Sequence, residues 1–456
     1  MIGALGKTLS RWSERWVPDP FVLALGLTLL TFALGLGFGA ALEDLSMSER
    51  VSALAAGWYD EFYATGLMKF ALQMCIVLIL GHALAMSRPV RRGIEALARA
   101  VKSPRAAVVV VALVACVASL VQWGLGAIAG AFMAREMGRA FAREGRAVHY
   151  PLLGAAGYAG FLVWHGGLSG SAPLKVAEAG HFLEAHIGVI PIDETLFSAL
   201  NIAVTLSLLF IIPAVFFALM PTDEADMVGF SQELEDAEHD EAPDASESAG
   251  VVAALEHGPW LSRFVALCIA AFVAWYFASR GAAGWTLDSI NLIFLGLGLA
   301  LHRSPMAYAR AVGDGARGAA GIILQFPFYF GILGLLKSSG LIVQIADFFV
   351  SISSATTFPV YTFFSAGLVN FFVPSGGGQW AVQGPVMMQA VARLGVEPYK
   401  VVMALSYGDA WTNMLQPFWA LPLLGIMGLR ARDIIGYTGF LIIVTAPVFL
   451  ILLAAF

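Results

Sequence analysis

The stretch Phe371-Phe372-Val373-Pro374-Ser375-Gly376-Gly377-Gly378-Gln379-Trp380 decides the fold. It interrupts an uncharged run that extends from Phe348 to Ala392. A helix cannot continue through a proline that is followed so closely by three glycines. At membrane depth, a non-helical backbone is tolerated only where protein buries it or where it lines a watery cavity. We therefore expect a hairpin tip that meets a solute, in preference to a plain loop between two short spans.

The rest of the chain is also apolar. Of its 456 residues, 59% are hydrophobic and 13% are charged, and runs long enough to cross a bilayer recur. This composition excludes a soluble domain and predicts an all-α polytopic protein of the bacterial inner membrane, embedded in lipid and without a nucleic-acid partner. The three cysteines lie in apolar runs, so we expect no disulfide and no metal cluster. The predicted crossings are 20–42, 67–86, 150–165, 194–219, 260–279, 286–301, 319–336, 399–416 and 434–455.

Two further apolar stretches, 106–134 and 356–392, are too long for one crossing and are interrupted in the middle. Arg105 and Arg135 flank the first stretch, and positive residues favour the cytoplasmic side of a membrane. Both ends of this stretch are therefore expected in the cytoplasm. We predict that each stretch forms a re-entrant hairpin of two half-helices.

Acidic residues are concentrated between Pro221 and Gly258, where twelve Asp and Glu occur without any Lys or Arg. The net charge of −6 therefore misleads, because 26 basic and 20 acidic residues remain elsewhere, a balance of +6. With nine crossings, two hairpins and the N-terminus inside, nineteen of the 26 basic residues fall on the cytoplasmic side. We expect the acidic stretch to be a disordered cytoplasmic tether between two halves.

The two halves have the same order of elements in opposite orientation: crossing, crossing, hairpin, broken crossing, crossing. At an offset of 249 residues, Tyr150 corresponds to Tyr399, Ala155 to Ala404, Tyr158 to Tyr407 and Pro173 to Pro422. Inverted repeats with paired broken helices are typical of a secondary transporter whose site lies at the bilayer midplane. The predicted divisions are a first repeat over 1–219 with a broken helix over 150–175, a linker and connecting helix over 220–284, and a second repeat over 285–456 with a broken helix over 399–417.

Four interruptions converge if the halves fold as inverted copies: Gln122–Gly126, Trp164–Ser171, Pro374–Trp380 and Asp409–Pro417. They contain glycines, hydroxyls, amides and four tryptophans, but no Lys or Arg. A carboxylate would be held by backbone N–H groups at half-helix N-termini and by Ser and Asn side chains, while the tryptophans enclose its apolar tail. The candidate substrate-binding residues are Gln122, Trp123, Gly124, Trp164, His165, Gly167, Ser169, Ser171, Ser375, Gly376, Gly377, Gln379, Trp380, Trp411 and Asn413.

Asp409 is the only ionisable acid in the range 401–429, and an acid at membrane depth indicates an ion or proton site. Thr412 and Asn413 follow it by three and four residues, so the three side chains share one helical face. Such oxygen ligands suit sodium, with the tip at Ser375–Gly378 completing the shell. They suit a proton relay less specifically.

His165 is the other titratable group at a break, and it is as readily a structural residue as a proton carrier. The chain has no Walker A sequence, no metal-binding His/Cys spacing and no evident nucleophile–base pair. ATP-driven transport and covalent catalysis are therefore unsupported. We expect no enzyme and no cofactor, with sodium as the one candidate metal ion.

Four motifs resemble those of the short-chain fatty-acid transporter family, the permeases associated with acetoacetate and butyrate use in bacteria. They are Val17-Pro18-Asp19-Pro20-Phe21, Trp164-His165-Gly166-Gly167-Leu168-Ser169-Gly170-Ser171-Ala172-Pro173, Phe372-Val373-Pro374-Ser375-Gly376-Gly377-Gly378-Gln379-Trp380 and Gly408-Asp409-Ala410-Trp411-Thr412-Asn413, and they span most of the chain. The wider resemblance is to the ion-transporter superfamily that includes citrate and divalent-anion carriers. It implies a homodimer with a fixed scaffold and a mobile transport domain, an elevator-type transporter. The family implies a short monocarboxylate as substrate and does not fix the coupling ion.

Two other functions remain open. The same scaffold could carry another small organic anion, such as a dicarboxylate or an amino-acid conjugate, although a dianion favours a fixed cation that the interruptions lack. The other function is that of an intramembrane enzyme or a channel. An enzyme needs a convergent acid–base or metal set, and a channel does not need two opposed hairpins. We therefore expect uptake of short monocarboxylates by symport with sodium or a proton.

Overall fold

The computed structural model describes residues 20–230 and 250–456, with the exception of 372 and 374. Within these ranges every regular element is helical, and six helices are long and apolar enough to cross a membrane. The prediction of an all-α polytopic membrane protein is therefore confirmed. The six helices are Thr65–Ala85, Pro104–Val121, Ala199–Leu219, Trp260–Gly284 (which includes a final 3-10 turn), Pro305–Ser339 and Ala431–Ala455.

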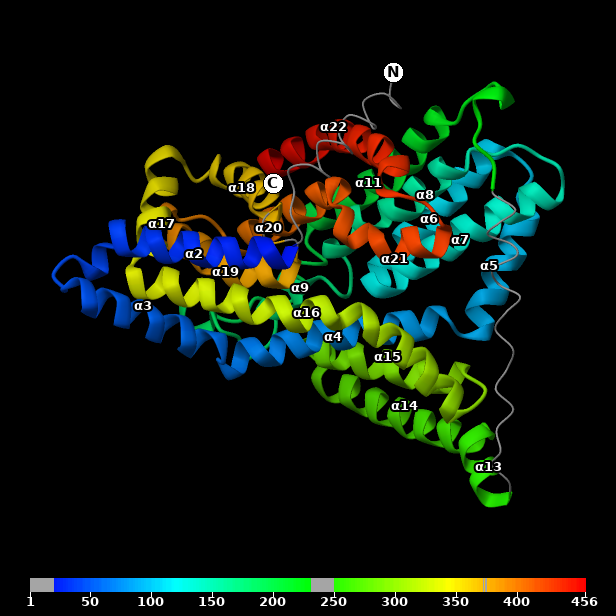
Figure 1. Ribbon diagram of the computed structural model, residues 1–456, viewed down its shortest axis with the longest axis horizontal. Coiled ribbons are helices and arrows are strands. Elements are labelled where there is room, and N and C mark those ends of the chain that lie inside the picture. Colours follow the sequence, from blue (N-terminus) through cyan, green and yellow to red (C-terminus); the bar gives the residue numbers. More distant parts are fainter. Residues whose placement is uncertain (1–19, 231–249, 372, 374) are drawn as a thin grey trace.

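One set of helices runs side by side across the lower part of Figure 1. This long-helix group consists of α2 (Pro20–Phe38), α3 (Met47–Phe62), α4 (Thr65–Ala85), α14 (Trp260–Arg280), α15 (Leu287–Leu301) and α16 (Pro305–Ser339). At its centre, α16 packs against α2, α3 and α4, while α15 packs against α4 and α14. With 35 residues, α16 is about 52 Å long and exceeds the hydrocarbon thickness of a bilayer. The predicted crossing 319–336 is thus only part of a longer helix.

A second set, the broken-helix group, lies across the upper part of Figure 1. It consists of α6 (Pro104–Val121), α7 (Trp123–Arg143), α8 (Tyr150–Tyr158), α9 (Ser171–Val176), α11 (Ala199–Leu219), α18 (Phe358–Asn370), α19 (Gly376–Leu394), α20 (Pro398–Thr412), α21 (Pro417–Met427) and α22 (Ala431–Ala455). Four helices complete the described connections: α5 (Arg88–Ala100), α10 (Glu184–Ile187), α13 (Gly250–His257) and α17 (Leu341–Ile352). The two groups meet where α4 packs on α7 and α16 packs on α19.

Glycines let helix backbones touch within each group. A Cβ atom on Gly334 of α16 would lie 2.0 Å from the carbonyl oxygen of Gly57 on α3. In the broken-helix group, a Cβ atom on Gly130 of α7 would lie 2.5 Å from the carbonyl oxygen of Gly157 on α8. Small residues that allow such an approach are typical of helix packing in membranes. Both contacts fix neighbouring helices at short range.

Each of the two interrupted stretches forms a pair of helices. The pair α6 and α7 is joined at Gln122, whose side chain accepts a hydrogen bond from Leu125 N at the start of α7. At the opposite end of the pair, Lys102 Nζ lies 2.8 Å from Glu144 Oε1. The helix α6 is long enough to cross a membrane by itself. It is therefore longer than the half-helix that the sequence predicts for this part of the hairpin. The second pair is α18 and α19.

The prediction of a disordered tether over 221–258 is wrong at both of its ends. Tyr150 N donates to the carbonyl oxygen of Val228 at 2.8 Å, and Val228 N donates to His149 Nδ1 at 2.9 Å. Residues 250–257 form α13. The backbone of the first ten linker residues is thus partly fixed against the start of α8. The acidic centre of the linker, 231–249, lies outside the described residues.

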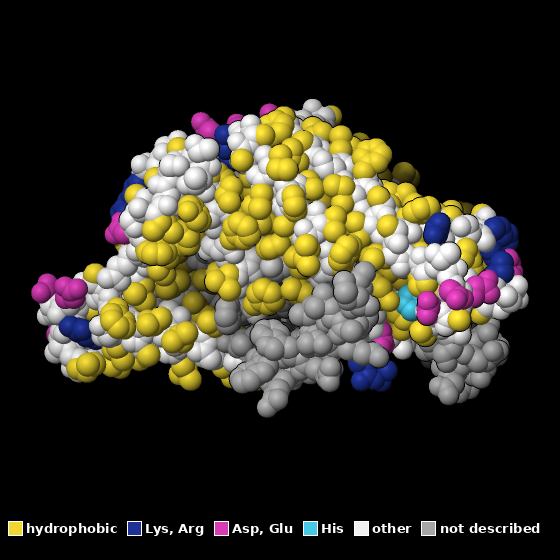
Figure 2. Space-filling view, turned by 90° about the horizontal axis from the view of Figure 1, so that it is seen from above, with side chains coloured by type: hydrophobic (Ala, Val, Ile, Leu, Met, Phe, Trp, Pro, Cys, Tyr) yellow, Lys and Arg dark blue, Asp and Glu magenta, His cyan; other side chains and the backbone are white. Residues whose placement is uncertain are grey.

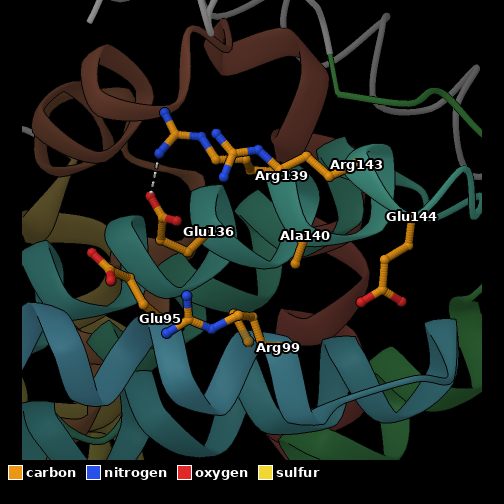
Figure 3. Close-up of a pocket in the computed structure, with 8 residues that line it drawn as sticks. Glu95, Arg99, Glu136, Arg139, Ala140, Arg143 and Glu144 are labelled. Carbon is orange, nitrogen blue, oxygen red and sulfur yellow. Dashed lines mark hydrogen bonds and ion pairs between the residues drawn. The ribbon is translucent and has the colours of Figure 1, made fainter.

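Charged side chains gather at the ends of the helices. A cleft of about 310 Å³ lies between α5 and the end of α7, and Figure 3 shows side chains of both signs around it. Across it, Glu95 and Arg99 of α5 face α7, where Arg139 Nη1 lies 2.9 Å from Glu136 Oε1. On the face in Figure 2, hydrophobic side chains cover the middle and charged ones gather mainly at the left and right ends. This distribution is that of a protein that spans a bilayer.

Candidate functional site

The first break follows α8, which has only nine residues. The predicted crossing 150–165 is therefore not one continuous helix. After α8, its second part consists of two 3-10 turns, Ala159–Leu162 and Trp164–Gly166. Beyond them the backbone runs along the end of α6, where Leu168 N donates to Leu120 O at 2.7 Å. A Cβ atom on Gly167 would meet that same carbonyl oxygen at 2.3 Å, so only glycine fits. The broken backbone is therefore packed directly against the first hairpin.

Ser169 joins this break to the tip of the first hairpin. Its Oγ accepts a hydrogen bond from Trp123 N at 2.9 Å, at the first residue of α7. Ser171, which begins α9, instead directs its Oγ to Met74 Sδ at 3.4 Å. The Ser169 hydroxyl is thus bonded to the first hairpin, and the Ser171 hydroxyl faces α4 in the long-helix group.

The second break separates α20 from α21 and is organised by an asparagine that the sequence reasoning missed. Asn370, the last residue of α18, directs its Nδ2 to Asp409 O (2.9 Å), Thr412 Oγ1 (3.0 Å) and Asn413 Oδ1 (2.8 Å). Its own Oδ1 is buried without a hydrogen-bond partner among the described residues. Three oxygens therefore surround one amide nitrogen that has only two hydrogens to donate.

The glycine tip between α18 and α19 lies against the first break. Ser375 caps α19 by accepting a hydrogen bond from Gly378 N at 3.3 Å. A Cβ atom on Gly376 would lie 2.1 Å from His165 Nε2, and one on Gly377 would lie 2.8 Å from Phe70 Cζ of α4. The tip therefore contacts both the first break and the long-helix group.

The two titratable groups that the sequence singles out separately meet in the structure. His165 Nε2 lies 3.1 Å from Asp409 Oδ1, and both residues are 0% exposed. Asn413 Nδ2 donates to the same carboxylate oxygen at 3.3 Å, whereas Oδ2 has no hydrogen-bond partner among the described residues. A buried contact between an imidazole and a carboxylate thus joins the first break to the second.

Two matched tyrosines add reciprocal contacts between the breaks. Tyr158 OH donates to the carbonyl oxygens of Asn413 (2.8 Å) and Gln416 (3.1 Å) at the second break. Tyr407 OH donates to Asn201 Oδ1 at 3.0 Å, and Asn201 Nδ2 donates to Gly166 O at 2.9 Å in the first break. One tyrosine from each side of the linker thus helps to hold the irregular backbone of the opposite break.

A small cavity lies where the tips meet the long-helix group. Its volume is about 20 Å³, room for a water molecule. No charged side chain lines it among the described residues, and the buried indole N–H groups of Trp123 and Trp164 have no hydrogen-bond partner there. The lining residues are Met74, Trp123, Phe161, Trp164, Ser171, Ile322, Phe326, Ser375, Gly376, Gly377 and Trp419.

Several candidate residues do not reach this cavity. Trp411 turns away, packs against Phe363 at a ring distance of 4.9 Å and donates its indole N–H to Ile442 O. Gln379 donates to Ala366 O within the second hairpin. Four more have structural contacts: Gln122 donates to Val77 O, Gly124 packs on Leu78, Gly378 packs on Tyr329, and Trp380 is fully buried beside Gly384. The cavity lining also lacks the candidates His165, Gly167, Ser169 and Asn413.

The structure also adds residues that the sequence analysis does not single out as functional. Phe161 and Trp419 line the cavity, and Asn370, Tyr158 and Asn201 hold the breaks. An asparagine in the uncharged run before the glycine tip is the one available signal, because a buried amide needs partners. Groups of three or more His, Cys, Asp or Glu that could hold a metal ion are absent from the described part of the chain.

Comparisons with known proteins agree with this architecture. A family model described as "Short chain fatty acid transporter" matches residues 1–456. A "Putative short-chain fatty acid transporter" of Escherichia coli K12 is 41% identical over 456 residues, all of both chains, and one of Haemophilus influenzae is 37% identical over 464 residues, 99% of each. The crystal structure of the Alcanivorax borkumensis YdaH transporter superposes with a TM-score of 0.60, at 15% identity, over 96% of this chain and 98% of that one. The last similarity concerns the fold alone.

Proposed function

Because the chain belongs to the short chain fatty acid transporter family, we propose that it takes up short monocarboxylates such as acetoacetate and butyrate. It is a membrane transporter and not an enzyme. The proposed location is the bacterial cytoplasmic membrane, and the proposed driving force is symport with sodium or a proton.

One observation carries the proposed substrate class. Trp123 and Trp164 line the cavity, and each has a buried indole N–H group that lacks a partner among the described residues. A buried donor without a partner is costly, and a carboxylate supplies acceptors for several donors. The apolar side chains of Met74, Ile322 and Phe326 form the opposite wall. Two donors and an apolar wall suit a small acid with a hydrocarbon tail, although a cavity of about 20 Å³ would have to widen to admit it.

The same lining disfavours a dianion. The described lining contains no Lys or Arg. Lys175 lies one turn beyond Ser171 on α9, but its Nζ lies 2.9 Å from Glu178 Oε2, and both side chains are buried. Its charge is therefore already balanced. A second carboxylate in the cavity would be desolvated without a countercharge.

We propose an elevator-type mechanism for a pair of inverted repeats over 1–219 and 285–456, joined by 220–284. The reciprocal contacts of Tyr158 and Tyr407 support this assignment. The broken-helix group, which holds the hairpins and both breaks, is the proposed mobile unit, and the long-helix group is the proposed scaffold. The cavity lies between them, so a shift of one group past the other would carry it across the membrane. A homodimer is proposed by resemblance to the superfamily.

The proposed sodium site is the oxygen cluster around Asn370. A half-turn of its amide exchanges Nδ2 and Oδ1 and would bring a fourth oxygen beside Asp409 O, Thr412 Oγ1 and Asn413 Oδ1. Oxygen ligands of this kind suit a hard cation. The competing proposal is a proton carried by the His165–Asp409 pair, whose 3.1 Å separation supports it.

Purified protein in liposomes is expected to show counterflow of labelled butyrate. Acetoacetate should compete, whereas succinate and citrate at the same concentration should not, because the cavity lacks a cation for a second carboxylate. Initial rates of counterflow measure this directly. Strong inhibition by succinate would contradict the proposed class and favour a carrier of another organic anion.

Asn413→Ala and Asn370→Ala are expected to raise the sodium concentration for half-maximal uptake roughly tenfold, the effect of losing one polar ligand. Butyrate affinity, measured at saturating sodium, should change less. The matched control is Asn291→Ala, which removes a buried asparagine that donates to Gln73 O in the long-helix group. Wild-type uptake by both variants in sodium-free medium under a pH gradient would assign coupling to the proton.

A further inference from the structure

A wide vestibule adjoins the cavity on one side. It has a volume of about 530 Å³ and lies between α4 and α16 on one wall and α7 and α21 on the other. At its mouth the side chains of Asp314 and Arg317 are 50% and 83% exposed. Solvent therefore reaches the vestibule, whose volume exceeds that of a short fatty acid many times.

Only aromatic rings are common to the two spaces. Trp123, Phe161 and Trp419 line both the cavity and the vestibule. Their ring centroids are 5.4 Å apart for Trp123 and Trp419, 6.3 Å for Trp123 and Phe161, and 6.2 Å for Phe161 and Trp419. Rings at such distances are in mutual contact. The three rings therefore form a collar between the cavity and the vestibule.

We propose that this aromatic collar, with Trp419 as its principal ring, determines the longest acid that the transporter accepts. The proposal rests on the proposed function and deepens it. With the carboxylate at the indole donors of Trp123 and Trp164, the tail would lie against the apolar side chains of the cavity, and an added methylene would meet the Trp419 ring, whose centroid lies 5.4 Å from that of Trp123. Replacing that ring by a methyl group joins the cavity to the vestibule and gives a longer tail room.

The position of Trp419 is tied to the second break. Trp419 lies on the first turn of α21, three residues after its N-cap residue Gln416. Gln416 Nε2 donates to Asn370 O, and the carbonyl oxygen of Gln416 accepts from Tyr158 OH at 3.1 Å. The ring is thus held from the same backbone that carries the oxygen cluster. A collar fixed in this way is a rigid stop, which a length-selective boundary requires.

The test measures competition against labelled acetoacetate uptake in liposomes by butyrate, hexanoate and octanoate. In the wild type the half-inhibitory concentration should rise with chain length. In Trp419→Ala, the values for hexanoate and octanoate relative to butyrate should fall by roughly tenfold or more, because a pocket discriminates by about tenfold for a single methylene and these acids have two and four more than butyrate. Trp419→Phe, which keeps a ring, should retain the wild-type order. Trp260→Ala removes an indole that is 79% exposed on α14 and serves as the matched control.

An unchanged order of inhibition in a transporting Trp419→Ala protein would overturn the collar proposal and leave the proposed function standing. If Trp419→Ala does not fold, Phe161→Leu carries the same test with the same expected shift. Failure of the wild type to take up acetoacetate would overturn the proposed function, and the collar proposal with it.

Discussion

Butyrate uptake by Gly376→Ala is expected to fall roughly 100-fold, the effect of displacing a binding group by about 1 Å. The added methyl group would lie 2.1 Å from His165 Nε2 and 2.9 Å from Trp164 Cη2. Neither ring can retreat, because both residues are buried and His165 pairs with Asp409. The glycine tip would therefore move away from the first break. Initial uptake rates, with the amount of folded protein measured by gel filtration, check this expectation.

Gly313→Ala is the matched control for this change. It introduces the same methyl group into α16, where nothing lies within 4 Å of the added atom. An exposed helical glycine replaced by alanine is neutral to slightly stabilising. Near-wild-type uptake by Gly376→Ala would show that the tip does not need to touch His165 during transport.

The second large effect concerns the stability of the His165–Asp409 pair. His165→Gln is expected to destabilise the protein by about 3–5 kcal/mol, because among the described side chains it leaves the fully buried carboxylate with neutral amide donors alone, those of Asn413 and the new glutamine, and with no group that can balance its charge. Asp409→Asn should destabilise the protein less than His165→Gln, because the imidazole that remains can be neutral. Thermal unfolding in detergent measures both variants.

The double variant His165→Gln/Asp409→Asn tests the coupling between the two side chains. Two neutral amides can hydrogen-bond to each other, so the double variant should be more stable than His165→Gln alone. Additive losses would mean that the 3.1 Å contact contributes nothing to folding. The comparison also separates stability from transport, since a well-folded double variant that fails to couple uptake to an ion locates the coupling step at this pair.

Part of the candidate site could be predicted from the sequence because helix breakers act locally. The interruptions fall near the predicted positions, and Trp164, Ser171, Ser375 and Gly376 line the cavity. The glycines of the second tip are nevertheless helical, because Gly376–Gly378 begin α19 behind the Ser375 cap. The pairing of His165 with Asp409 could not be predicted, because 244 residues separate them and no local rule connects their side chains. Trp411 does not reach the cavity for a related reason. It follows Asp409 by two residues, which places its side chain on the opposite side of α20.

The errors in the fold have equally physical causes. The apolar run of α16 begins only after Asp314 and Arg317, so hydropathy predicts a crossing of 319–336. The helix itself begins earlier, at Pro305, because charged residues can lie outside the membrane and still be part of a helix. The linker end at Val228 is held by hydrogen bonds to His149 and Tyr150, which composition cannot detect.

Two helices that are equally apolar in sequence differ in what they tolerate. All nine residues of α8 are buried by neighbouring protein, and Gly157 touches the backbone of α7. Only 11% of the apolar window of α14 is buried, so lipid is its principal neighbour. Exchanges among Leu, Ile, Val and Phe on α14 therefore leave solvation by acyl chains unchanged, whereas the same exchanges on α8 alter a close-packed shape. On α14 a side chain needs only to be hydrophobic, whereas on α8 each side chain must also have the right volume. Neutral substitutions will therefore accumulate on α14 first.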